Sequence, residues 1–545
     1  PNTGSNTVTA CDAYSWDGMT YTTSGIYTNT YTNVSGCDSV HTLNLTINYS
    51  TSSLDTQVAC DTYFWNGTTY TASGTYTYFT TNAVGCDSTV VLNLTINQAD
   101  TSYTNITACD SLVWNGVTYD SSGVYTFLPE FIQLGQDIDG EAQDDYSGGS
   151  VSLSSDGSIM AIGAFENDGN GSKSGHVRVY EIIGGSWLQI GQDIDGEAAW
   201  DKSGWSVSLS SDGNTVAIGA LGNDGNGSNS GHVRIYQNIG GSWSQIGGDI
   251  DGEADNDQSG YSVSLSSDGN TVAIGAPDNN GINSSSGHVR VYQNVNGSWT
   301  QLGQDIDGEA AGDHSGYSVS LSSDGNTVAI GTPYNDGNGS DAGHVRIYEN
   351  IGGTWSQIGA DIDGEAASDF SGWSVSLSAD GNTVAIGTPY NNGNGSNAGH
   401  VRIYENTAGS WSQIGQDIDG EAEQDQNGYS VSLSADGNTV AIGAWFNDGN
   451  GFNSGHVRIY ENINGTWIQL GGDIDGEAAV DISGCSVSLS SDGNTVAIGA
   501  AYNDGNGSDA GHVRVYNLPL LTNSGGCDST AILNLTITNA NTSTT

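Results

Sequence analysis

The stretch Asp137-Ile-Asp-Gly-Glu-Ala142 opens a sequence unit that recurs through the middle of the chain. A fixed period of this kind is typical of solenoids, propellers and other repeat arrays, so it is considered before any local motif. The first aspartate returns every 56 residues, which makes seven copies without insertion or deletion, and its later positions are Asp193, Asp249, Asp305, Asp361, Asp417 and Asp473.

Each copy contains four short stretches with the pattern of β-strands. In one copy, residues 317–322 alternate apolar and polar side chains, and a second strand follows at 327–331 after the turn Asp324-Gly325-Asn326. Two more strands are predicted at 344–348 and 355–359. Four strands in a unit of this length are typical of a propeller blade. The sequence therefore predicts an all-β fold with a seven-bladed β-propeller of four-stranded blades.

The two ends of the array predict that the blades close into a ring. The seventh copy ends after the strand 512–516 and lacks a fourth strand, whereas an orphan fourth strand begins at Phe131, before the first copy. We expect residues 131–136 to complete the seventh blade by pairing beside 512–516. Such a strand overlap removes exposed sheet edges.

Taken together, the copies resemble the FG-GAP repeats of integrin-alpha-type propellers. The resemblance rests on Ser259-Gly-Tyr-Ser-Val263, Ile274-Gly-Ala-Pro277 and Gly287-His-Val-Arg-Val-Tyr292, and it covers about residues 131–517. It implies a propeller fold. The family often holds calcium in a long Asp-rich loop between its first two strands, but this chain has only a short turn there, such as 268–270.

A second, different repeat occupies residues 1–127, with a period of 49 residues from Cys11 to Cys60 to Cys109. In the first two modules another cysteine follows 26 residues later, at Cys37 and at Cys86. Modules of this size cannot bury a large core, and a disulfide over such a loop contributes about 3 kcal/mol. We therefore predict the disulfides Cys11–Cys37 and Cys60–Cys86, in an oxidising, extracellular setting.

The third module is split in the sequence. It begins at Cys109, its pattern stops near Phe127, and its second half, with Cys527, returns after the propeller. We predict a Cys109–Cys527 disulfide and a propeller inserted into this module, which requires that the two ends of the propeller lie close together. The remaining Cys485 is expected to be a buried free thiol. The predicted domains are modules 1–49, 50–98 and 99–127 plus 522–545, and the propeller 128–521.

The cysteine modules resemble repeats of very large secreted surface proteins of Bacteroidota that read Cys-Asp-Ser-Tyr-Thr-Trp-Asn-Gly. The matching residues here include Cys60-Asp61 and Trp65-Asn66-Gly67. The resemblance covers about 1–127 and 519–540. It implies a secreted, extracellular or cell-surface protein exported by the type IX route, with a role in adhesion or in surface appendages.

The charge of the chain excludes some classes of partner. Lys and Arg total 9 against 62 Asp and Glu, a net charge of −53. Such a chain will not bind nucleic acid or an anionic membrane by electrostatics, although it attracts divalent cations. The sequence has no apolar run long enough for a membrane helix, so we expect no membrane insertion. Seven of the nine cations are one arginine per copy: Arg178, Arg234, Arg290, Arg346, Arg402, Arg458 and Arg514.

Repeated polar residues supply the candidate sites. Clustered carboxylates can hold Ca²⁺ through oxygen ligands, or they can be turn and strand-end residues. The same two interpretations apply to the loop Asn-Asp-Gly-Asn-Gly, for example Asp448 and Asn450, for which turn chemistry is favoured. We expect the repeated His and Arg to pack between blades, with each Arg paired to an Asp. The candidate calcium ligands are Asp139, Glu141, Asp145, Asp195, Glu197 and Asp201.

The leading hypothesis is a non-enzymatic segment of a large extracellular protein, acting in adhesion or as a building block of an appendage. Its partners would be neighbouring modules, further copies, or glycans and proteins on other cells. The alternative is a lectin-like propeller, in which aromatic side chains stack on sugars rather than only packing. Near-identical blades offer few asymmetric groups, so we expect no enzyme. The candidate aromatic residues are Phe165, Tyr334, Tyr390, Trp445 and Tyr502.

Overall fold

The computed structural model describes residues 3–32, 34–60, 62–98, 100–109, 111–114, 117–126, 131–518 and 529–538. Their regular secondary structure consists of β-strands, and none of the described residues forms a helix that could cross a membrane. The chain divides into two compact units. Unit 1 comprises Pro1–Phe127 and Leu520–Thr545, and unit 2 comprises Leu128–Pro519.

Unit 1 contains three small sheets of the same topology. In the first, β1 (Thr3–Cys11) runs parallel to the central β5 (Asp38–Asn48), and β4 (Gly25–Thr32) runs antiparallel to it. The second sheet has the order β6 (Thr51–Cys60), β10 (Asp87–Asn97), β9 (Gly74–Thr81). The third has the order β11 (Asp100–Cys109), β49 (Ser529–Thr538), β14 (Gly123–Thr126).

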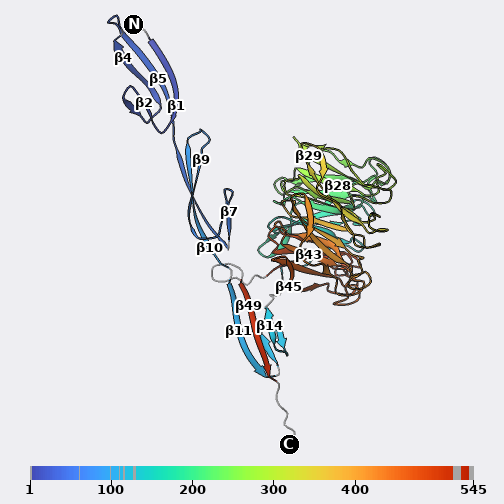
Figure 1. Cartoon of the computed structure of the whole chain (residues 1–545). Helices are drawn as coiled ribbons and strands as arrows, with labels where there is room; N and C mark the ends of the chain where they lie inside the picture. The colour runs from blue at the N-terminus through green and yellow to red at the C-terminus, as the bar shows by residue number, and fades with distance from the viewer. Residues whose placement is uncertain are drawn as a thin grey trace. The chain divides into compact units, whose positions relative to one another are not determined.

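The third sheet is assembled from segments on either side of unit 2 in the sequence. β11 and β49 are paired in parallel and lie side by side in Figure 1. Each module also has a short hairpin: β2 (Tyr14–Trp16) with β3 (Met19–Tyr21), β7 (Tyr63–Trp65) with β8 (Thr68–Tyr70), and β12 (Leu112–Trp114) with β13 (Val117–Tyr119).

The core of each module is as small as its length suggests. In the first module Leu43, Leu45 and Ile47 alternate along β5 and are buried, because successive side chains of a strand point to opposite faces. Trp16 and Tyr27, among other partly buried side chains, pack against these three residues. The alternation that predicted a half-buried strand is therefore confirmed.

The disulfide pairing differs from the prediction. Cys11 bonds to Cys86, with the two Cα atoms 5.5 Å apart, so the predicted pairs Cys11–Cys37 and Cys60–Cys86 are both wrong. Cys60 is also disulfide-bonded. The predicted Cys109–Cys527 bond involves Cys527, which lies outside the described residues.

The strand topology explains why Cys11 does not bond to Cys37. Because β1 and β5 are parallel, Cys11 lies opposite Asn48 at the end of β5, whereas Cys37 precedes the start of that strand. Ten residues of extended chain separate these ends by roughly 33 Å, while a disulfide needs Cα atoms within about 7 Å. After Asn48 the chain leads directly into β6, whose first residue pairs with Ser88, and this brings Cys86 close to Cys11. The disulfide thus links two successive modules.

Unit 2 is built from repeated sheets of four main strands. In the first sheet β17 (Ser147–Leu153), β18 (Ile159–Ala164), β19 (His176–Ile183) and β20 (Ser186–Gln189) follow one another, and the short β21 (Ile194–Asp195) also pairs with β19. The next two sheets repeat this order with β22 (Ser203–Leu209), β23 (Thr215–Ala220), β24 (His232–Asn238), β25 (Trp243–Gln245) and β26 (Ile250–Asp251), and with β27 (Ser262–Leu265), β28 (Thr271–Ala276), β29 (His288–Val295), β30 (Ser298–Gln301) and β31 (Ile306–Asp307).

The fourth, fifth and sixth sheets have the same order. Their strands are β32 (Ser318–Leu321), β33 (Thr327–Thr332), β34 (His344–Asn350), β35 (Trp355–Gln357) and β36 (Ile362–Asp363); β37 (Ser374–Leu377), β38 (Thr383–Thr388), β39 (His400–Thr407), β40 (Ser410–Gln413) and β41 (Ile418–Asp419); and β42 (Asn427–Leu433), β43 (Thr439–Ala444), β44 (His456–Ile463) and β45 (Thr466–Asp475). The four strands predicted at 317–359 thus agree with β32 to β35.

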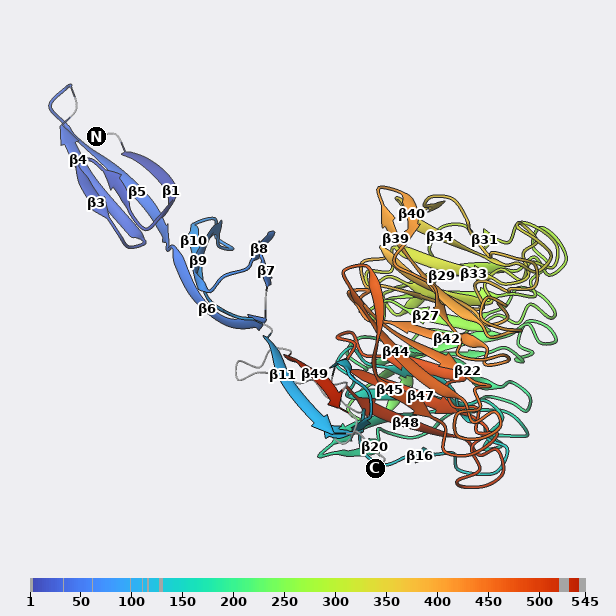
Figure 2. The same ribbon diagram turned by 60° about the horizontal axis from the view of Figure 1, so that its bottom comes forward.

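The last sheet contains both ends of unit 2. Its strands β46 (Ser486–Leu489), β47 (Thr495–Ala500) and β48 (His512–Asn517) come from the end of the unit, and β47 and β48 lie side by side in Figure 2. The strands β15 (Ile132–Gln133) and β16 (Ile138–Asp139) come from its beginning and pair with β48. The predicted pairing of 131–136 beside 512–516 is therefore confirmed.

The apolar core lies between neighbouring sheets. One cluster combines Val289 and Val291 of β29 with Val328 and Ile330 of β33 in the next sheet. Glycine permits this close approach, because a Cβ at Gly275 would stand 2.0 Å from the carbonyl oxygen of Gly316 in the neighbouring sheet. The first and last sheets share a core in the same way, with Ile162 packed in one cluster with Val513 and Val515.

Backbone hydrogen bonds also connect each sheet to the next near the ends of the first strands. The amide of Ser155 donates to the carbonyl of Ser211, and the last bond of the series runs from the amide of Ser491 back to the carbonyl of Ser155. These hydrogen bonds form a closed series with N···O distances of 2.8–2.9 Å, which passes through Ser155, Ser211, Ser267, Ser323, Ala379, Ala435 and Ser491.

Candidate functional site

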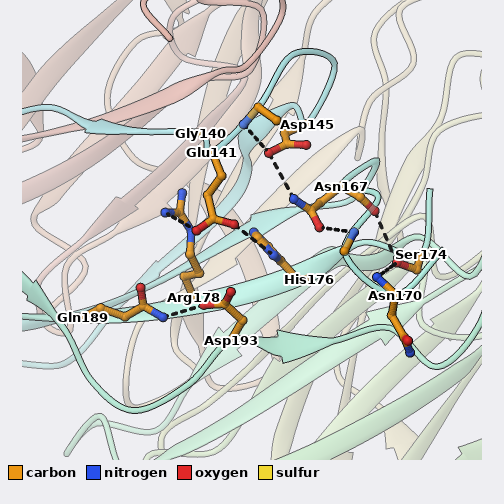
Figure 3. A network of polar contacts seen from close by, with 12 residues as sticks. Gly140, Glu141, Asp145, Asn167, Asn170, Ser174, His176, Arg178, Gln189 and Asp193 are labelled. Atoms are coloured by element: carbon orange, nitrogen blue, oxygen red, sulfur yellow. Dashed lines mark hydrogen bonds and ion pairs between the residues drawn. The ribbon is translucent and has the colours of Figure 1, made fainter. Parts of the chain in front are cut away.

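The third strand of every sheet in unit 2 begins with a buried His-Val-Arg segment. Alternation along the strand places the His and the Arg on the same face. The histidines are 1–2% exposed and the arginines 4–6%. Figure 3 shows the first of these segments, with His176 and Arg178 facing Glu141 and Asp193. Burial of a charged group at a repeated position requires partners in every repeat.

Each arginine has partners in the neighbouring sheet. The Nη2 atom of Arg178 donates a 2.8 Å hydrogen bond to the backbone carbonyl of Asp139, and its Nη1 lies 3.7 Å from Oε1 of Glu141. Its guanidinium also lies 5.5 Å from the ring centroid of Tyr180, a cation–π contact. We expected an Asp side chain as the partner. The structure instead uses an Asp backbone carbonyl and a Glu carboxylate, because Asp139 in β16 turns its carbonyl toward the guanidinium.

The histidine shares the same glutamate. Nδ1 of His176 lies 4.0 Å from Oε2 of Glu141, and the corresponding distance from His512 to Glu477 is 3.8 Å. Burial, reinforced by the charge of the nearby arginine, lowers the pKa of these imidazoles, and it lowers that of His232 to about 4. The imidazoles are therefore neutral at neutral pH, and each has a ring nitrogen with a free lone pair.

Two carboxylates and the imidazole approach one another at five of these histidines. In the first, one ligand atom each from Glu141, His176 and Asp193 lie within 4.8 Å of one another. The Glu comes from the loop after the short strand of the preceding sheet, and the Asp comes from the segment before the short strand of the same sheet as the His. Five such groups among the described residues are Asp137–Glu477–His512, Glu141–His176–Asp193, Glu197–His232–Asp249, Glu253–His288–Asp305 and Glu309–His344–Asp361.

The candidate calcium ligands have separate partners. Asp145 is buried and accepts hydrogen bonds from the amide of Ala142 and from Nδ2 of Asn167, at 2.9 and 3.1 Å. Asp201 makes the equivalent bonds to the amide of Ala198 and to Asn223. Glu141 and Glu197 contact Arg178 and Arg234, and Asp139 and Asp195 are exposed. The carboxylate that joins Glu141 near His176 is Asp193, not Asp139 or Asp145.

The Asn-Asp-Gly-Asn-Gly loops show the hydrogen bonds of turns. Oδ1 of Asp448 accepts from the amide of Asn453 at 2.7 Å, and Oδ1 of Asn447 accepts from the amide of Gly449 at 2.7 Å. Nδ2 of Asn450 instead joins the loop to a distant segment, donating to the carbonyl of Gly476 at 2.8 Å. Side chains that satisfy backbone groups of their own loop stabilise a turn. The favoured interpretation of these loops as turns agrees with this geometry.

The candidate ligand-binding aromatics belong to a continuous series of ring contacts. Phe165 stacks on Tyr146 at 5.6 Å, and Trp445 stacks on Tyr429 at 3.7 Å between centroids. All are partly buried except Tyr502, which is 36% exposed. The rings between them were not among the candidates, although five of them, from Trp205 to Tyr429, recur at one position of the 56-residue period. The series, called here the aromatic band, runs Tyr502, Tyr146, Phe165, Trp205, Tyr261, Tyr317, Trp373, Tyr429, Trp445, with Tyr334 and Tyr390 beside it.

Cys485 occupies the same position of the period as the central aromatic residues. It is a free thiol, as predicted, and its Sγ lies 3.4 Å from the carbonyl oxygen of Gly499. Burial raises the pKa of this thiol to about 11. A small cavity of about 140 Å³ lies where the first strands end, and its lining includes Leu153, Ser155 and Ser211.

Comparisons with known proteins identify the repeat. A family model described as the FG-GAP repeat matches residues 194–236, 306–348, 361–404 and 418–460. Among curated protein sequences, none matches the chain.

Three solved structures of similar arrangement are a putative 6-phosphogluconolactonase of Bacteroides uniformis, the periplasmic gluconolactonase PpgL of Pseudomonas aeruginosa, and the C-terminal WD40 domain of Sif2. Their identities to this chain are 13%, 17% and 16%, with TM-scores of 0.43, 0.45 and 0.43. The similar regions cover 60%, 67% and 72% of this chain, and 85%, 92% and 99% of the respective structures.

Two of these names correct an expectation from the sequence. Near-identical blades led us to expect no enzyme, yet two of the three similar structures are named as lactonases. The physical reason is that repetition in the strands leaves the loops free to differ, and catalytic groups are disproportionately found on loops. Repetition alone therefore does not exclude catalysis, and at these identities and TM-scores no activity is carried over to this chain.

The period, the four-stranded sheets and the family match agree. The middle of this chain contains FG-GAP repeats and has a propeller-like all-β fold.

Proposed function

We propose that this chain is a segment of a large extracellular surface protein, in which disulfide-linked β modules and a closed seven-bladed propeller act in adhesion or in building a surface appendage. The observation that carries this proposal is the Cys11–Cys86 disulfide, which joins one module covalently to the next. A bond between modules contributes little to the core of either one, but it carries tension directly from Cys11 to Cys86, so the residues between them are not extended when the chain is pulled.

The strand topology of the modules supports the same role. The chain enters the first module at the start of β1 and leaves it at the end of β5, and these two strands are paired in parallel from Thr3 to Cys11. When the disulfide is reduced, tension along the chain therefore loads all the hydrogen bonds between the two strands at once, in shear, instead of opening them one by one. Disulfides persist in oxidising compartments, which supports an extracellular location.

The closed seven-bladed arrangement, inserted into the third module, is part of the proposal. It is supported by the hydrogen bond from Ser491 to Ser155, which returns the series of sheets to its start. It is also supported by the third sheet of unit 1, whose order β11-β49-β14 matches that of β1-β5-β4. Deletion of residues 131–135 removes β15 and is expected to lower the melting temperature of residues 128–519. An unchanged melting temperature would contradict the closure.

Two measurements test the proposed role. Antibodies against residues 3–98 should label intact cells that produce the parent protein, without permeabilisation. Beads coated with the chain should adhere to a target surface and stay attached under flow. A reducing agent should make them detach more easily, because it breaks the disulfides between modules. Labelling that occurs only in permeabilised cells would refute the extracellular assignment.

The aromatic band favours a second candidate function, a lectin-like surface. Partly exposed rings at several repeats can stack on sugars, and several weak sites increase the overall affinity. A glycan array probed with the wild type and with the double variant Trp445→Ala/Tyr502→Ala tests this function. Binding that the double variant loses supports a lectin, and binding that does not change assigns these rings to packing.

A further inference from the structure

The His–Glu–Asp groups of unit 2 combine three features of a metal site. First, the imidazole is inside the protein, and in the sixth sheet its carboxylate-facing nitrogen is unpartnered. His456 is 1% exposed, and its Nδ1, which lies 4.0 Å from Oε2 of Glu421, has no hydrogen-bond partner. A buried polar group without a partner costs free energy, unless something absent from the protein chain itself binds it.

Second, the carboxylates are held so that one oxygen of each remains available. Oε1 of Glu309 lies 3.5 Å from Nη1 of Arg346. Oδ1 of Asp361 accepts a 2.6 Å hydrogen bond from Nε2 of Gln357, and its other oxygen, Oδ2, lies 3.9 Å from Nδ1 of His344. In the first group it is the glutamate that lies near Nδ1, since Glu141 contacts Arg178 through Oε1 and His176 through Oε2. Groups that orient metal ligands commonly bind them in this way.

Third, the distances fit a shared ion better than a direct contact. In five of the histidines Nδ1 lies 3.8–4.0 Å from a carboxylate oxygen, which is too far for a hydrogen bond. Zn²⁺ binds nitrogen and carboxylate oxygen at about 2.0–2.2 Å, so one ion can bridge ligand atoms up to about 4.2 Å apart. The glutamates are 44–48% exposed, which leaves a path for an ion from solvent.

We propose that each His–Glu–Asp group of unit 2 binds one divalent transition-metal ion such as Zn²⁺, with Nδ1 of the histidine and one oxygen from each carboxylate as ligands. The imidazole decides the class of ion, because nitrogen ligands suit zinc, copper and nickel, whereas Ca²⁺ and Mg²⁺ take oxygen ligands. The net charge of −53 favours cation binding in general. The group that contains His512 depends on Asp137, which precedes β16, so it forms only when the start of unit 2 pairs with β48.

Histidine NMR of the full chain, first freed of metal by a chelator, tests the proposal with Zn²⁺ alone as the probe. Zn²⁺ should shift the imidazole signals of the seven buried histidines, whereas Ca²⁺ at the same concentration should leave them in place. His41 and His314 lie outside the repeated His-Val-Arg segments and serve as internal controls. Seven unshifted signals with Zn²⁺, or equal shifts with Ca²⁺, would overturn the proposal.

Matched variants in the fourth sheet locate the effect. Glu309→Gln removes one proposed ligand, while Glu349→Gln makes the same change at an exposed glutamate on β34. With Glu309→Gln the His344 signal should require at least tenfold more Zn²⁺ for half of its shift, and with Glu349→Gln it should respond as in the wild type. Because Glu309 is half-exposed, its variant should keep the fold, which the unchanged signals of the other histidines verify. Equal responses of the two variants would refute the assignment of Glu309 as a ligand.

Discussion

The Nη2 atom of Arg234 donates a 2.6 Å hydrogen bond to the backbone carbonyl of Asp195, and the two residues belong to different sheets. Asp195 ends the short strand β21, which pairs with β19 in the first sheet, whereas Arg234 lies on β24 in the second. The same contact recurs in every copy. An acidic chain with few cations thus keeps one arginine at each junction between sheets.

Replacement of Arg234 by Met should destabilise unit 2 by about 2 kcal/mol or more, because a buried hydrogen bond from a charged group contributes about 1.5–3 kcal/mol. Urea unfolding followed by circular dichroism measures the change. Lys173→Met is the control, since the Lys173–Glu166 pair is partly exposed and such pairs contribute about 0–1 kcal/mol. Equal losses in the two variants would contradict the role of the arginine at the junction.

The Cys11–Cys86 bond joins residues that are 75 positions apart in the sequence. Removal of a disulfide that closes a loop of this size is expected to lower the free energy of unfolding of the modules by about 4 kcal/mol. Cys86→Ser should therefore lower the melting temperature of the modules and leave that of unit 2 unchanged. Peptide mapping without reductant checks the pairing directly. A peptide that links Cys11 to Cys37 would show the module topology to be wrong.

The aromatic band predicts sensitivity to alkaline pH. Burial raises the pKa of Tyr261 to about 12, and burial with nearby acidic groups raises that of Tyr146 to about 12. In the unfolded chain a tyrosine ionises near pH 10. The stability from these neutral phenols is thus fully present below pH 10 and is lost as the pH rises toward 12.

Ultraviolet absorbance of phenolate and circular dichroism, recorded across this pH range, test the prediction. Ionisation of the buried tyrosines should coincide with unfolding, and Tyr261→Phe should lose less stability than the wild type between pH 10 and 12. Ionisation of every tyrosine near pH 10 with the fold intact would refute it.

Cys485 should react slowly in the folded chain. Its pKa of about 11 leaves little of the reactive thiolate at pH 8, and the thiol is partly buried. Iodoacetamide should modify it at least tenfold more slowly in the native than in the urea-unfolded protein, as measured by mass spectrometry of its peptide. Equal rates in the two states would indicate an accessible thiol.

Local patterns predicted the parts of this fold that local chemistry determines. The alternation at 317–322 and the turn at 324–326 agree with β32 and the hairpin to β33, because side-chain period and turn residues act within a few residues. The orphan strand near Phe131 indicated β15 because its counterpart was missing after β48.

Features that depend on distant pairing were not predicted. The spacing from Cys11 to Cys37 suggested proximity, but parallel pairing of β1 with β5 separates the two, and sequence alone does not distinguish parallel from antiparallel neighbours here. The contact of Glu141 with His176 was also missed, although each copy repeats both at a constant separation. A glutamate and a histidine that always occur together at one spacing are the signal that would have indicated the group.

The returning hydrogen bond from Ser491 to Ser155 has a consequence for how such a gene can change. Tandem duplication readily adds or removes a copy of a near-identical repeat, and in unit 1 an extra module would simply lengthen the row. In unit 2 an eighth copy would have to be inserted between two neighbouring sheets that are already hydrogen-bonded to each other. Selection should therefore hold the number of FG-GAP copies constant among descendants of this gene, while the number of cysteine modules drifts.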